Sequence, residues 1–416
     1  MRERLADQNQ LFGLGKHGII SGFGLQGQVR HVRSAKWFLT AIFFVCGCGR
    51  EIDSTIKAVR VTGASMSPTL WGEHRLFECP GCRVQWNANW QPDLRPSGAI
   101  RCWNCGFDGP MLRQPTREGS VVHIDTAAYQ SRLPNIDDMV AIRDGSSVRI
   151  KRVVAVAGQV ISSRSGLLFR DDQPLISSAP WVIVHDDSFR RGDVSWWQGN
   201  SPVLVQKVER GFDMRADDQP ALLLYGHRSP YDQLRPDCVR DDYAGNLNES
   251  RWLREVTRLG VQAYVDVLAA TQLHCWQWTA QGAVCETTTL SRGHHRLDIR
   301  WSRLSQDHVQ PPPTLDAEHP IALSIQQGSL CIRRLVVRRP IIYWIDEATP
   351  AMIKLPLKIK RSHFFVIGDN VPLSVDSRHG AAVTQSQIVG KVVRPAFEDV
   401  NEAARFASPT ALSDDS

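Results

Sequence analysis

The stretch VRIKRVVAVAG occupies residues 148–158 and has the composition of a buried β-strand. Its valines and isoleucine favour an extended backbone. Lys151 interrupts the apolar run directly after Ile150. Either its ammonium group reaches solvent at a strand edge, or it lies among nonpolar neighbours and loses affinity for its proton. The stretch therefore predicts a core strand and a candidate general base.

Two distant stretches contain further residues of the kinds that build catalytic sites. GASMSPTL, residues 63–70, places Ser65 on a turn before Met and Pro. FFVIGDNVPLSVDSRHG, residues 364–380, gathers acidic, small polar and basic side chains within a few positions, among them Ser374, Asp376 and Arg378. Taken singly, each stretch is equally consistent with an ordinary surface turn or a loop closed by an ion pair.

The remainder of the chain is dominated by β patterns. IKAVRV at 56–61, SVVHI at 120–124 and DMVAI at 138–142 are short runs typical of strands. From about 165 to 345, short β runs recur at roughly 10-residue spacing, which is typical of a sandwich or jelly roll. Within that region GSLCIRRLVV and IIYWI suggest two paired strands. We expect a mainly β protein.

Four cysteines form two CxxC pairs separated by 19 residues: Cys79, Cys82, Cys102 and Cys105. Two such turns can present four thiolates to one zinc ion, and a site with four protein ligands has no open position for a substrate. The pattern predicts a structural zinc in a ribbon-like insert and no catalytic cofactor. Two disulfides are the alternative, since the chain has features of an exported protein. Cys275 and Cys285 flank a turn and could also pair.

Charge and hydrophobicity limit the partners and the location. Lys plus Arg minus Asp plus Glu is 49 − 43 = +6, too small an excess to predict nucleic-acid binding. Basic residues precede the apolar run Trp37–Cys46, as at the start of a secretory signal. Val45-Cys46-Gly47-Cys48 resembles a lipobox. We expect attachment to the lipid bilayer of the cytoplasmic membrane, with the folded region on the periplasmic face. A lipid anchor, a tilted span and a short buried element remain alternatives.

Together, the three stretches resemble the motifs of type I signal peptidases, Ser–Lys endopeptidases that remove leader peptides from exported proteins. Ser65 to Leu70 matches the Ser-Met-x-Pro-Thr-Leu motif, and Lys151 to Val154 matches Lys-Arg-Val-Val with Gly158 following. Gly368-Asp369-Asn370 with Ser374, Asp376, Ser377 and Arg378 matches the third motif. These motifs stand in family order, and the resemblance covers only a minority of the chain.

The chain departs from the family pattern at three positions or segments. Asp137 stands where the family favours Gly, and Gln159 replaces an acidic residue. Val371-Pro372-Leu373 replaces a commonly polar Arg-Asp-Asn. None of these is the nucleophile or the base.

The resemblance implies a role for each matched side chain. Ser65 would attack the scissile carbonyl and Lys151 would take its proton. Ser374 would hold the lysine amine, and Asp376 with Arg378 would form a supporting ion pair.

The same resemblance implies how substrate is held. The Ser65 N–H and the backbone at Gly63 would bind the oxyanion. The substrate would add as a strand between the neighbourhoods of Val61 and Ile150.

The predicted fold is a signal-peptidase-like β fold with an inserted zinc ribbon and an inserted β-sandwich. The expected segments are a basic N-terminus (1–36), an export signal or anchor (37–50), a first segment of the catalytic core (51–76), the ribbon (77–107), a second core segment (108–164), the sandwich (165–345), a third core segment (346–400) and a polar tail (401–416).

The predicted function is membrane-associated removal of signal peptides from exported preproteins. One alternative is a non-catalytic zinc-ribbon and lectin-like binding protein on a degenerate peptidase scaffold. A self-cleaving repressor-type peptidase shares the Ser–Lys pair, but it would need a DNA-binding helical head, which the N-terminal sequence does not suggest.

Overall fold

A computed structural model describes residues 55–89, 100–188, 195–209, 211–247, 251–279, 281–301, 311–345 and 353–393. The expected export segment at 37–50 lies outside these ranges. As predicted, the described chain is mainly β, with two 3-10 turns, η1 (Ser377–His379) and η2 (Gln385–Gln387), and no α-helix. No helix in the described ranges is long and apolar enough to cross a membrane.

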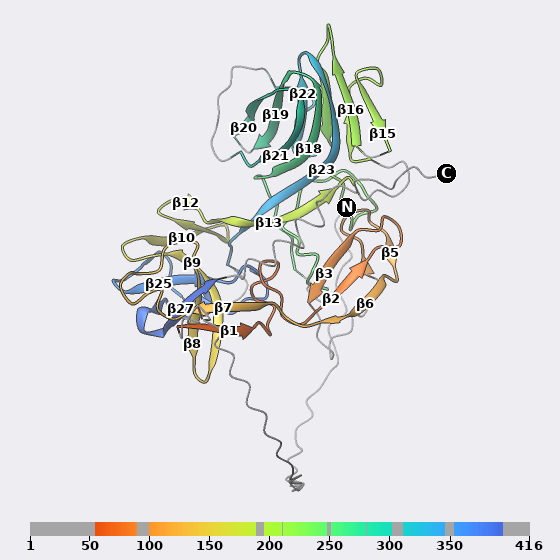
Figure 1. The fold of residues 1–416 in the computed structure, drawn as a ribbon. Coiled ribbons are helices and arrows are strands. Elements are labelled where there is room, and N and C mark those ends of the chain that lie inside the picture. The colour runs from red at the N-terminus through yellow and green to blue at the C-terminus, as the bar shows by residue number, and fades with distance from the viewer. Residues whose placement is uncertain are drawn as a thin grey trace, which may run out of the picture. The chain divides into compact units, whose positions relative to one another are not determined.

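One seven-stranded antiparallel sheet contains most of the peptidase-like motif strands (Figure 1). Its order is β1-β7-β27-β8-β9-β25-β26. The strands are β1 (Ile56–Arg60), β7 (Val121–Asp125), β27 (Ile388–Val393), β8 (Met139–Asp144), β9 (Ser147–Ala155), β25 (His363–Ile367) and β26 (Val383–Thr384). Segments far apart in sequence therefore meet in one sheet, with β9 next to β25.

A four-stranded sheet of order β12-β11-β10-β24 continues from the end of β9. It consists of β10 (Val160–Arg164), β11 (Leu167–Arg170), β12 (Gln173–Pro174) and β24 (Leu357–Lys358). Its core residues Ile161 and Leu168 pack in one cluster with Ile367 of β25 and Tyr343. The boundary expected at 164/165 thus falls inside the β10–β11 hairpin.

The cysteine motifs stand on two small sheets of their own, with orders β3-β2-β6 and β4-β5. The strands are β2 (His74–Glu78), β3 (Gln85–Asn89), β4 (Ile100–Arg101), β5 (Asp108–Gly109) and β6 (Leu112–Arg117). Phe77, Trp86 and Met111 form a small core around the four cysteines. The three-stranded sheet extends beyond both bounds of the ribbon expected at 77–107, because β2 begins at His74 and β6 ends at Arg117.

Two larger sheets form a sandwich in the inserted region (Figure 1). Val261, Leu273, Leu323 and Ile332 contribute to one core shared by the two sheets. The first sheet contains β15 (Val205–Val208), β16 (Gly211–Ala216), β23 (Gly328–Ile342), β18 (Gly260–Ala269) and β21 (Gly293–Ile299), with β13 (Ile176–Asp186) also paired to β23. The second contains β14 (Trp197–Gly199), β17 (Ala221–Tyr225), β22 (Ile321–Ile325), β19 (Thr271–Thr279) and β20 (Gly282–Leu290).

Two details of the sandwich differ from, or extend, the expectations from sequence. IIYWI does not form a separate strand: Ile341 and Ile342 belong to β23, which runs without a break through Pro340, and Trp344 forms only an isolated bridge to Leu167. Cys275 and Cys285 are both free thiols. Trp276 stands opposite Cys285 across the strand pair, so Cys275 points to the other face of the sheet and a disulfide between the two is excluded.

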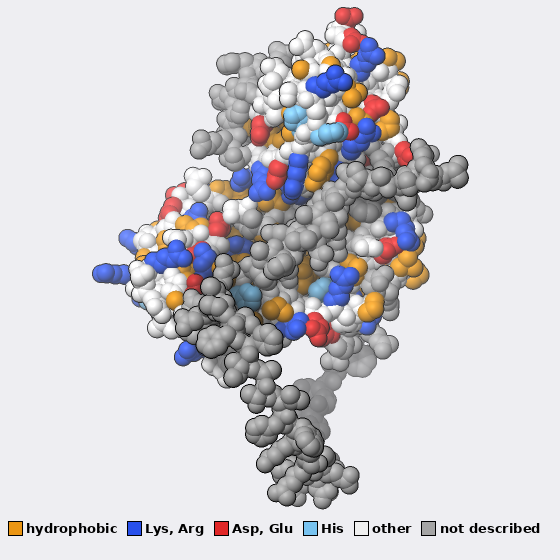
Figure 2. Space-filling model, viewed as in Figure 1, with side chains coloured by type: hydrophobic (Ala, Val, Ile, Leu, Met, Phe, Trp, Pro, Cys, Tyr) orange, Lys and Arg blue, Asp and Glu red, His pale blue; other side chains and the backbone are white. Residues whose placement is uncertain are grey.

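The visible surface carries acidic and basic side chains side by side, without a region of one sign (Figure 2). This mixture agrees with the small net charge of +6. Exposed apolar side chains include Leu373 and Val375, which flank Ser374, at 45% and 58% exposure.

Candidate active site

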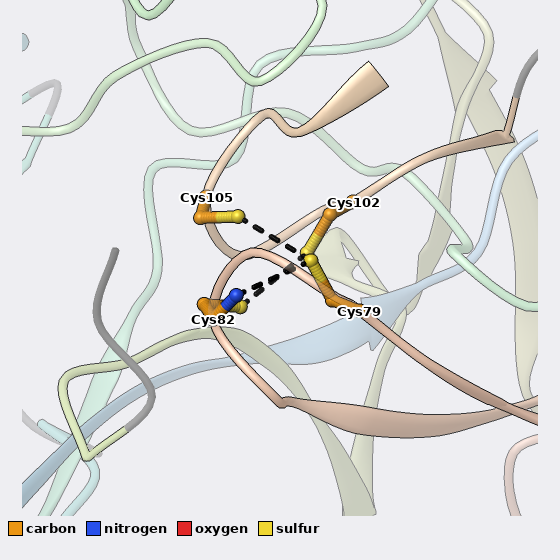
Figure 3. Close-up of side chains that lie close together, drawn as sticks. All are labelled: Cys79, Cys82, Cys102 and Cys105. Atoms are coloured by element: carbon orange, nitrogen blue, oxygen red, sulfur yellow. Dashed lines mark hydrogen bonds between the residues drawn. The ribbon is translucent and has the colours of Figure 1, made fainter. Parts of the chain in front are cut away.

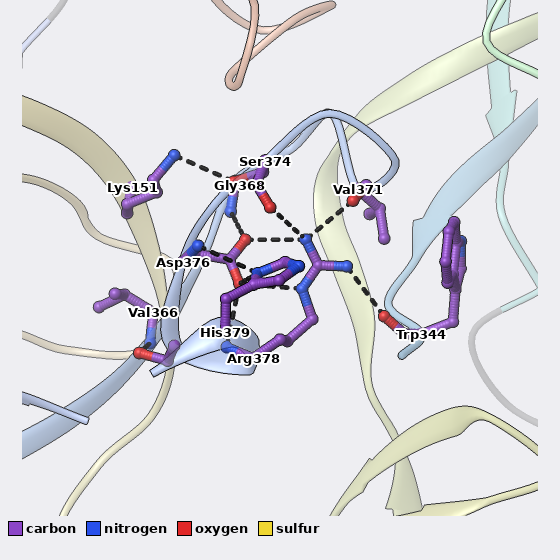
Figure 4. A network of polar contacts seen from close by, with 10 residues as sticks. Lys151, Trp344, Val366, Gly368, Val371, Ser374, Asp376, Arg378 and His379 are labelled. Carbon is purple, nitrogen blue, oxygen red and sulfur yellow. Dashed lines mark hydrogen bonds and ion pairs between the residues drawn. The ribbon is translucent and has the colours of Figure 1, made fainter. Parts of the chain in front are cut away.

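Lys151 lies where β9 passes from the surface into the core. Residues 147–150 of this strand are exposed or half-buried, whereas 151–155 are all buried. Only 3% of Lys151 is exposed. Burial disfavours the charged ammonium and lowers the pKa of Lys151 to about 8, even though Asp376 acts in the opposite direction. Among the described residues its Nζ donates a hydrogen bond to Ser374 Oγ at 3.0 Å (Figure 4).

A buried polar network extends from Ser374 through Asp376 to Arg378 (Figure 4). The Ser374 hydroxyl also hydrogen-bonds the Asp376 carboxylate. Arg378 Nε and Nη2 each donate to Asp376, both at 2.9 Å, and Nη2 donates to the Ser374 carbonyl at 3.0 Å. Burial alone would raise the pKa of Asp376, but the charge of Arg378 and the hydrogen bonds lower it. Ser374, Asp376 and Arg378 therefore lie together beside Lys151, with the carboxylate form of Asp376 favoured.

The turn that carries Ser65 packs on the loop that follows β25. Asn370 N–H donates to the Ser65 carbonyl at 3.0 Å, and Asn370 Nδ2 donates to the Ala64 carbonyl at 3.1 Å. A Cβ on Gly368 would lie 2.3 Å from both the Ser65 carbonyl oxygen and Ser374 Oγ. Because Gly368 has no side chain, the Ser65 turn and the Ser374 hydroxyl can both approach its backbone closely.

A buried ion pair braces the same loop from β9. Arg152 donates to Asp369 through Nε at 2.8 Å and Nη2 at 2.6 Å, a bidentate arrangement. Thr69 Oγ1 also donates to the Asp369 carboxylate. Arg152 follows Lys151 directly, so the strand of Lys151 and the turn of Ser65 are joined through the Asp369 carboxylate.

The residues expected at the oxyanion and substrate positions lie around this turn. Gly63 is exposed, and a Cβ there would meet no atom within 4 Å. Val61 and Ile150 pack in one apolar cluster with Met66 and Leu70. Ile150 pairs with Ala141 of β8, and in the described chain residues 147–150 pair with no strand on their other edge.

The four cysteines of the two CxxC turns converge, and all are buried (Figure 3). Their sulfur atoms lie within 4.8 Å of one another, with Cys79–Cys105 at 3.6 Å and Cys82–Cys102 at 3.7 Å. Tetrahedral ligands at zinc–sulfur distances of about 2.3 Å stand about 3.8 Å apart, so the quartet fits a metal ion. Backbone N–H groups of Gly81 and Cys82 point to Cys79 Sγ. All four cysteines are free thiols in the structure.

The motif resemblance assigned no role to some residues of this site, and other residues of the site lie outside the motifs altogether. Arg152, Asp369 and Asn370 belong to the first group. Tyr243 and Asn246 belong to the second: Tyr243 Oη donates to the Asp369 carbonyl at 3.2 Å, and Asn246 Nδ2 donates to Asn370 Oδ1 at 2.8 Å. Both lie in the inserted region, in the segment DYAGNLN, which has only the composition of a turn.

Comparison with known families agrees with this geometry over one stretch of the chain. Residues 343–397 match the family described as signal peptidase, peptidase S26. This stretch contains the loop from Gly368 to Arg378 and is signal-peptidase-like; Ser65 and Lys151 lie outside it. No match among the curated proteins was found.

Similar solved structures include two family 11 carbohydrate-binding modules of Clostridium thermocellum. The first, from a cellulosomal cellulase, is 14% identical over 41% of this chain and 99% of its own, with a TM-score of 0.22. The second, in complex with a mixed-linked tetrasaccharide, is 14% identical over 39% and 95%, also with a TM-score of 0.22. A structure described under carbohydrate-binding modules of the β-sandwich superfamily is 9% identical over 70% and 98%, with a TM-score of 0.16.

Proposed function

We propose that the chain is a serine endopeptidase that uses Ser65 and Lys151 to remove signal peptides from exported preproteins. One observation carries the proposal: the turn of Ser65 and the hydrogen-bond partner of a buried lysine meet at Gly368. Such an arrangement is unneeded for stability alone, because burying a lysine is unfavourable. The family match at 343–397 supports the same class of enzyme.

The chemistry follows from the environment of Lys151. At its reference pKa near 10.4, roughly one lysine in 2,500 is neutral at pH 7. A pKa of about 8 raises the neutral fraction to about one in ten. Neutral Lys151 can donate one N–H to Ser374 and keep its lone pair for the Ser65 proton. Ser65 Oγ then bonds to the scissile carbonyl carbon, and the proton passes from Lys151 to the leaving amine as the peptide bond breaks.

Hydrolysis of the resulting ester completes the cycle. Lys151, neutral again, takes a proton from water as the hydroxide oxygen bonds to the acyl carbon, and the proton then returns to Ser65 Oγ. The negative oxygen formed in each step would accept from the Ser65 N–H. Ser374, Asp376 and Arg378 keep the amine in place throughout.

The open edge of β9 supports binding of substrate as an added strand. Residues 147–150 have a free edge in the described chain, and β1 pairs only with β7 there. An extended peptide could take main-chain hydrogen bonds from either edge. Val61 and Ile150, in one cluster beside the Ser65 turn, would line shallow pockets for small side chains.

We further propose that the four cysteines hold one structural zinc and that the protein works at the periplasmic face of the cytoplasmic membrane. The zinc is supported by the closeness of the four sulfur atoms, two pairs of which stand at the separation expected of tetrahedral ligands. A bound zinc would stabilise the small sheets, whose own core is limited. The second rests on the sequence features around Trp37–Cys46 and on the expected substrates.

The direct test is cleavage of a preprotein by the purified full-length chain, with the cleavage site determined by mass spectrometry. We expect one cut at the end of the signal peptide. Ser65→Ala and Lys151→Arg should abolish it, since arginine does not release its proton at usable pH. Ser386→Ala, at an exposed serine, is the matched control and should retain full activity. Cleavage that persists in purified Ser65→Ala would refute the proposal.

A binding role for the inserted region is the second candidate. A cleft of about 360 Å³ is lined by residues of this region and by Trp103 of the β4–β5 turn. Two of its aromatic side chains are exposed, Tyr231 at 43% and Trp252 at 96%. Exposed aromatic rings beside polar groups suit a ligand with both apolar and hydrogen-bonding faces, such as a saccharide. Calorimetric titration with oligosaccharides, with Trp252→Ala as the comparison, tests this role independently of cleavage.

A further inference from the structure

A short turn of the inserted region, Tyr243–Leu247, contacts the loop that positions Ser65. We call it the junction turn. It is closed by a hydrogen bond from Asn246 N–H to the Tyr243 carbonyl at 2.8 Å. From it, Tyr243 Oη donates to the Asp369 carbonyl at 3.2 Å. The side chains of Asn246 and Asn370 hydrogen-bond reciprocally, at 2.8 and 2.9 Å.

The junction turn is also held by the cysteine-bearing sheets. Asn89, at the end of β3, donates its backbone N–H to the Gly245 carbonyl at 2.8 Å. Its Nδ2 donates to Asn246 Oδ1 at 2.8 Å and to Ser67 Oγ at 3.3 Å. Ala244 and Leu247 pack against the core around the cysteines. Three separate regions of the chain therefore meet at Asn246.

Close packing fixes the junction turn against the Ser65 segment. A Cβ on Gly245 would lie 2.8 Å from the Trp71 ring and 3.1 Å from the Asn87 carbonyl. Asn370 is fully buried, so its amide depends on protein partners. Those partners are Asn246 on one side and the Ala64 carbonyl with Ser67 Oγ on the other. Asn370 is thus the link between the inserted region and the turn of the nucleophile.

We propose that Asn246 is a positioning residue for the peptidase reaction: it orients Asn370, which in turn holds the Ala64–Ser67 turn and so the Ser65 hydroxyl. The inference rests on the proposed function. The inserted region accordingly completes the active site, and the reaction depends on it. Displacement of a catalytic group by about 1 Å can cost 10²-fold in rate, so the loss of this link should appear in kcat.

The test compares Asn246→Ala with Asn200→Ala in the full-length enzyme. Asn200 is a matched control, because it also lies in the inserted region and makes two hydrogen bonds to backbone, with the Pro220 carbonyl and the Leu222 N–H. For Asn246→Ala we expect kcat to fall about 10- to 100-fold, with KM within about twofold of wild type. The pH midpoint of kcat/KM should not move, because the side-chain hydrogen bonds of Asn246 described above join Asn89 and Asn370 and act on the Ser65 turn. Asn200→Ala should retain wild-type kcat.

Asn246→Asp provides a second variant if the alanine variant does not fold. It keeps the shape and the acceptor oxygen but cannot donate to Asn370, so kcat should fall in the same direction. If wild type cleaves, Ser65→Ala is inactive and both Asn246 variants keep wild-type kcat, the positioning role is wrong while the proposed function stands. If Asn246→Ala and Asn200→Ala lose activity equally, in proportion to their loss of stability, the role of Asn246 is merely structural and the inference fails. A wild type that cleaves no signal peptide refutes the proposed function itself.

Discussion

Lys151 Nζ lies 3.0 Å from Ser374 Oγ, although 223 positions separate the two residues. The contact forms because β9 and β25 are neighbours in one sheet and the loop after β25 turns back over Lys151. It places the amine in a buried setting where the charged form is disfavoured, while Asp376 and Arg378 hold the serine that it contacts.

The pH dependence of cleavage should report the pKa of Lys151. With the neutral Lys151 amine as the proposed base, kcat/KM should rise with pH and level off, with a midpoint near 8. Initial rates on a signal-peptide substrate between pH 6 and 10 give the profile. A midpoint near the ordinary lysine value would show that Lys151 is not the base or is not desolvated.

Replacing the lysine should stabilise the fold while abolishing activity. A pKa lowered from 10.5 to about 8 means that the folded chain binds this proton less tightly than the unfolded chain. Below pH 8, burial of the Lys151 ammonium lowers the free energy of unfolding by about 3 kcal/mol, and this penalty disappears as the pH rises through about 10.5. Lys151→Met should therefore raise the free energy of unfolding at pH 7 by up to about 3 kcal/mol, and by little near pH 10.5. Denaturant titrations at both pH values measure this, with Lys57→Met, at an exposed lysine, as the control. Equal stability of wild type and Lys151→Met at pH 7 would contradict the burial penalty.

Gly368→Ala should disable the site by steric conflict alone. The new methyl group would lie 2.3 Å from the Ser65 carbonyl oxygen and from Ser374 Oγ, so at least one must move. We expect kcat/KM to fall by at least about 100-fold. Gly380→Ala is the control, since a Cβ there meets no atom within 4 Å. Normal turnover by a folded Gly368→Ala enzyme would mean that catalysis does not require the present positions of the Ser65 carbonyl oxygen and Ser374 Oγ.

The cysteine quartet should bind one zinc per chain. Metal analysis of the purified protein should give this ratio, and Cys102→Ser should lose the metal and lower the unfolding temperature. Cys238→Ser, outside the quartet, should keep the metal. Two disulfides among Cys79, Cys82, Cys102 and Cys105, found by mass spectrometry of the non-reduced protein, would replace the metal site with a redox one.

Local pattern was sufficient for the strands and for the cysteine quartet. The β-branched residues of 148–158 predict β9, and the CxxC spacing predicts the quartet, because both depend on near neighbours in sequence. The meeting of Lys151 with Ser374 followed from the motif resemblance, since no local pattern relates residues so far apart.

Other features could not be read from the sequence, because tertiary contacts decide them. Asn246 stands in a segment indistinguishable from a surface turn, and only the packing of three regions of the chain gives it partners. Ser165-Gly166 looked like a domain boundary but is the turn of a hairpin, with φ of 49° and 75°. GSLCIRRLVV and IIYWI suggested two paired strands, whereas β23 continues through Pro340 and pairs with β13.

The most direct test of the Ser65–Lys151 pair is to identify the residue that becomes acylated. A signal-peptide ester with a good leaving group, mixed with enzyme and quenched with acid within the burst phase, should leave its acyl group on the protein. Peptide mapping by mass spectrometry then locates it. We predict an adduct on Ser65 in wild type and none in Lys151→Met. An adduct on another residue, or equal acylation of Ser65 without the lysine, would contradict the account.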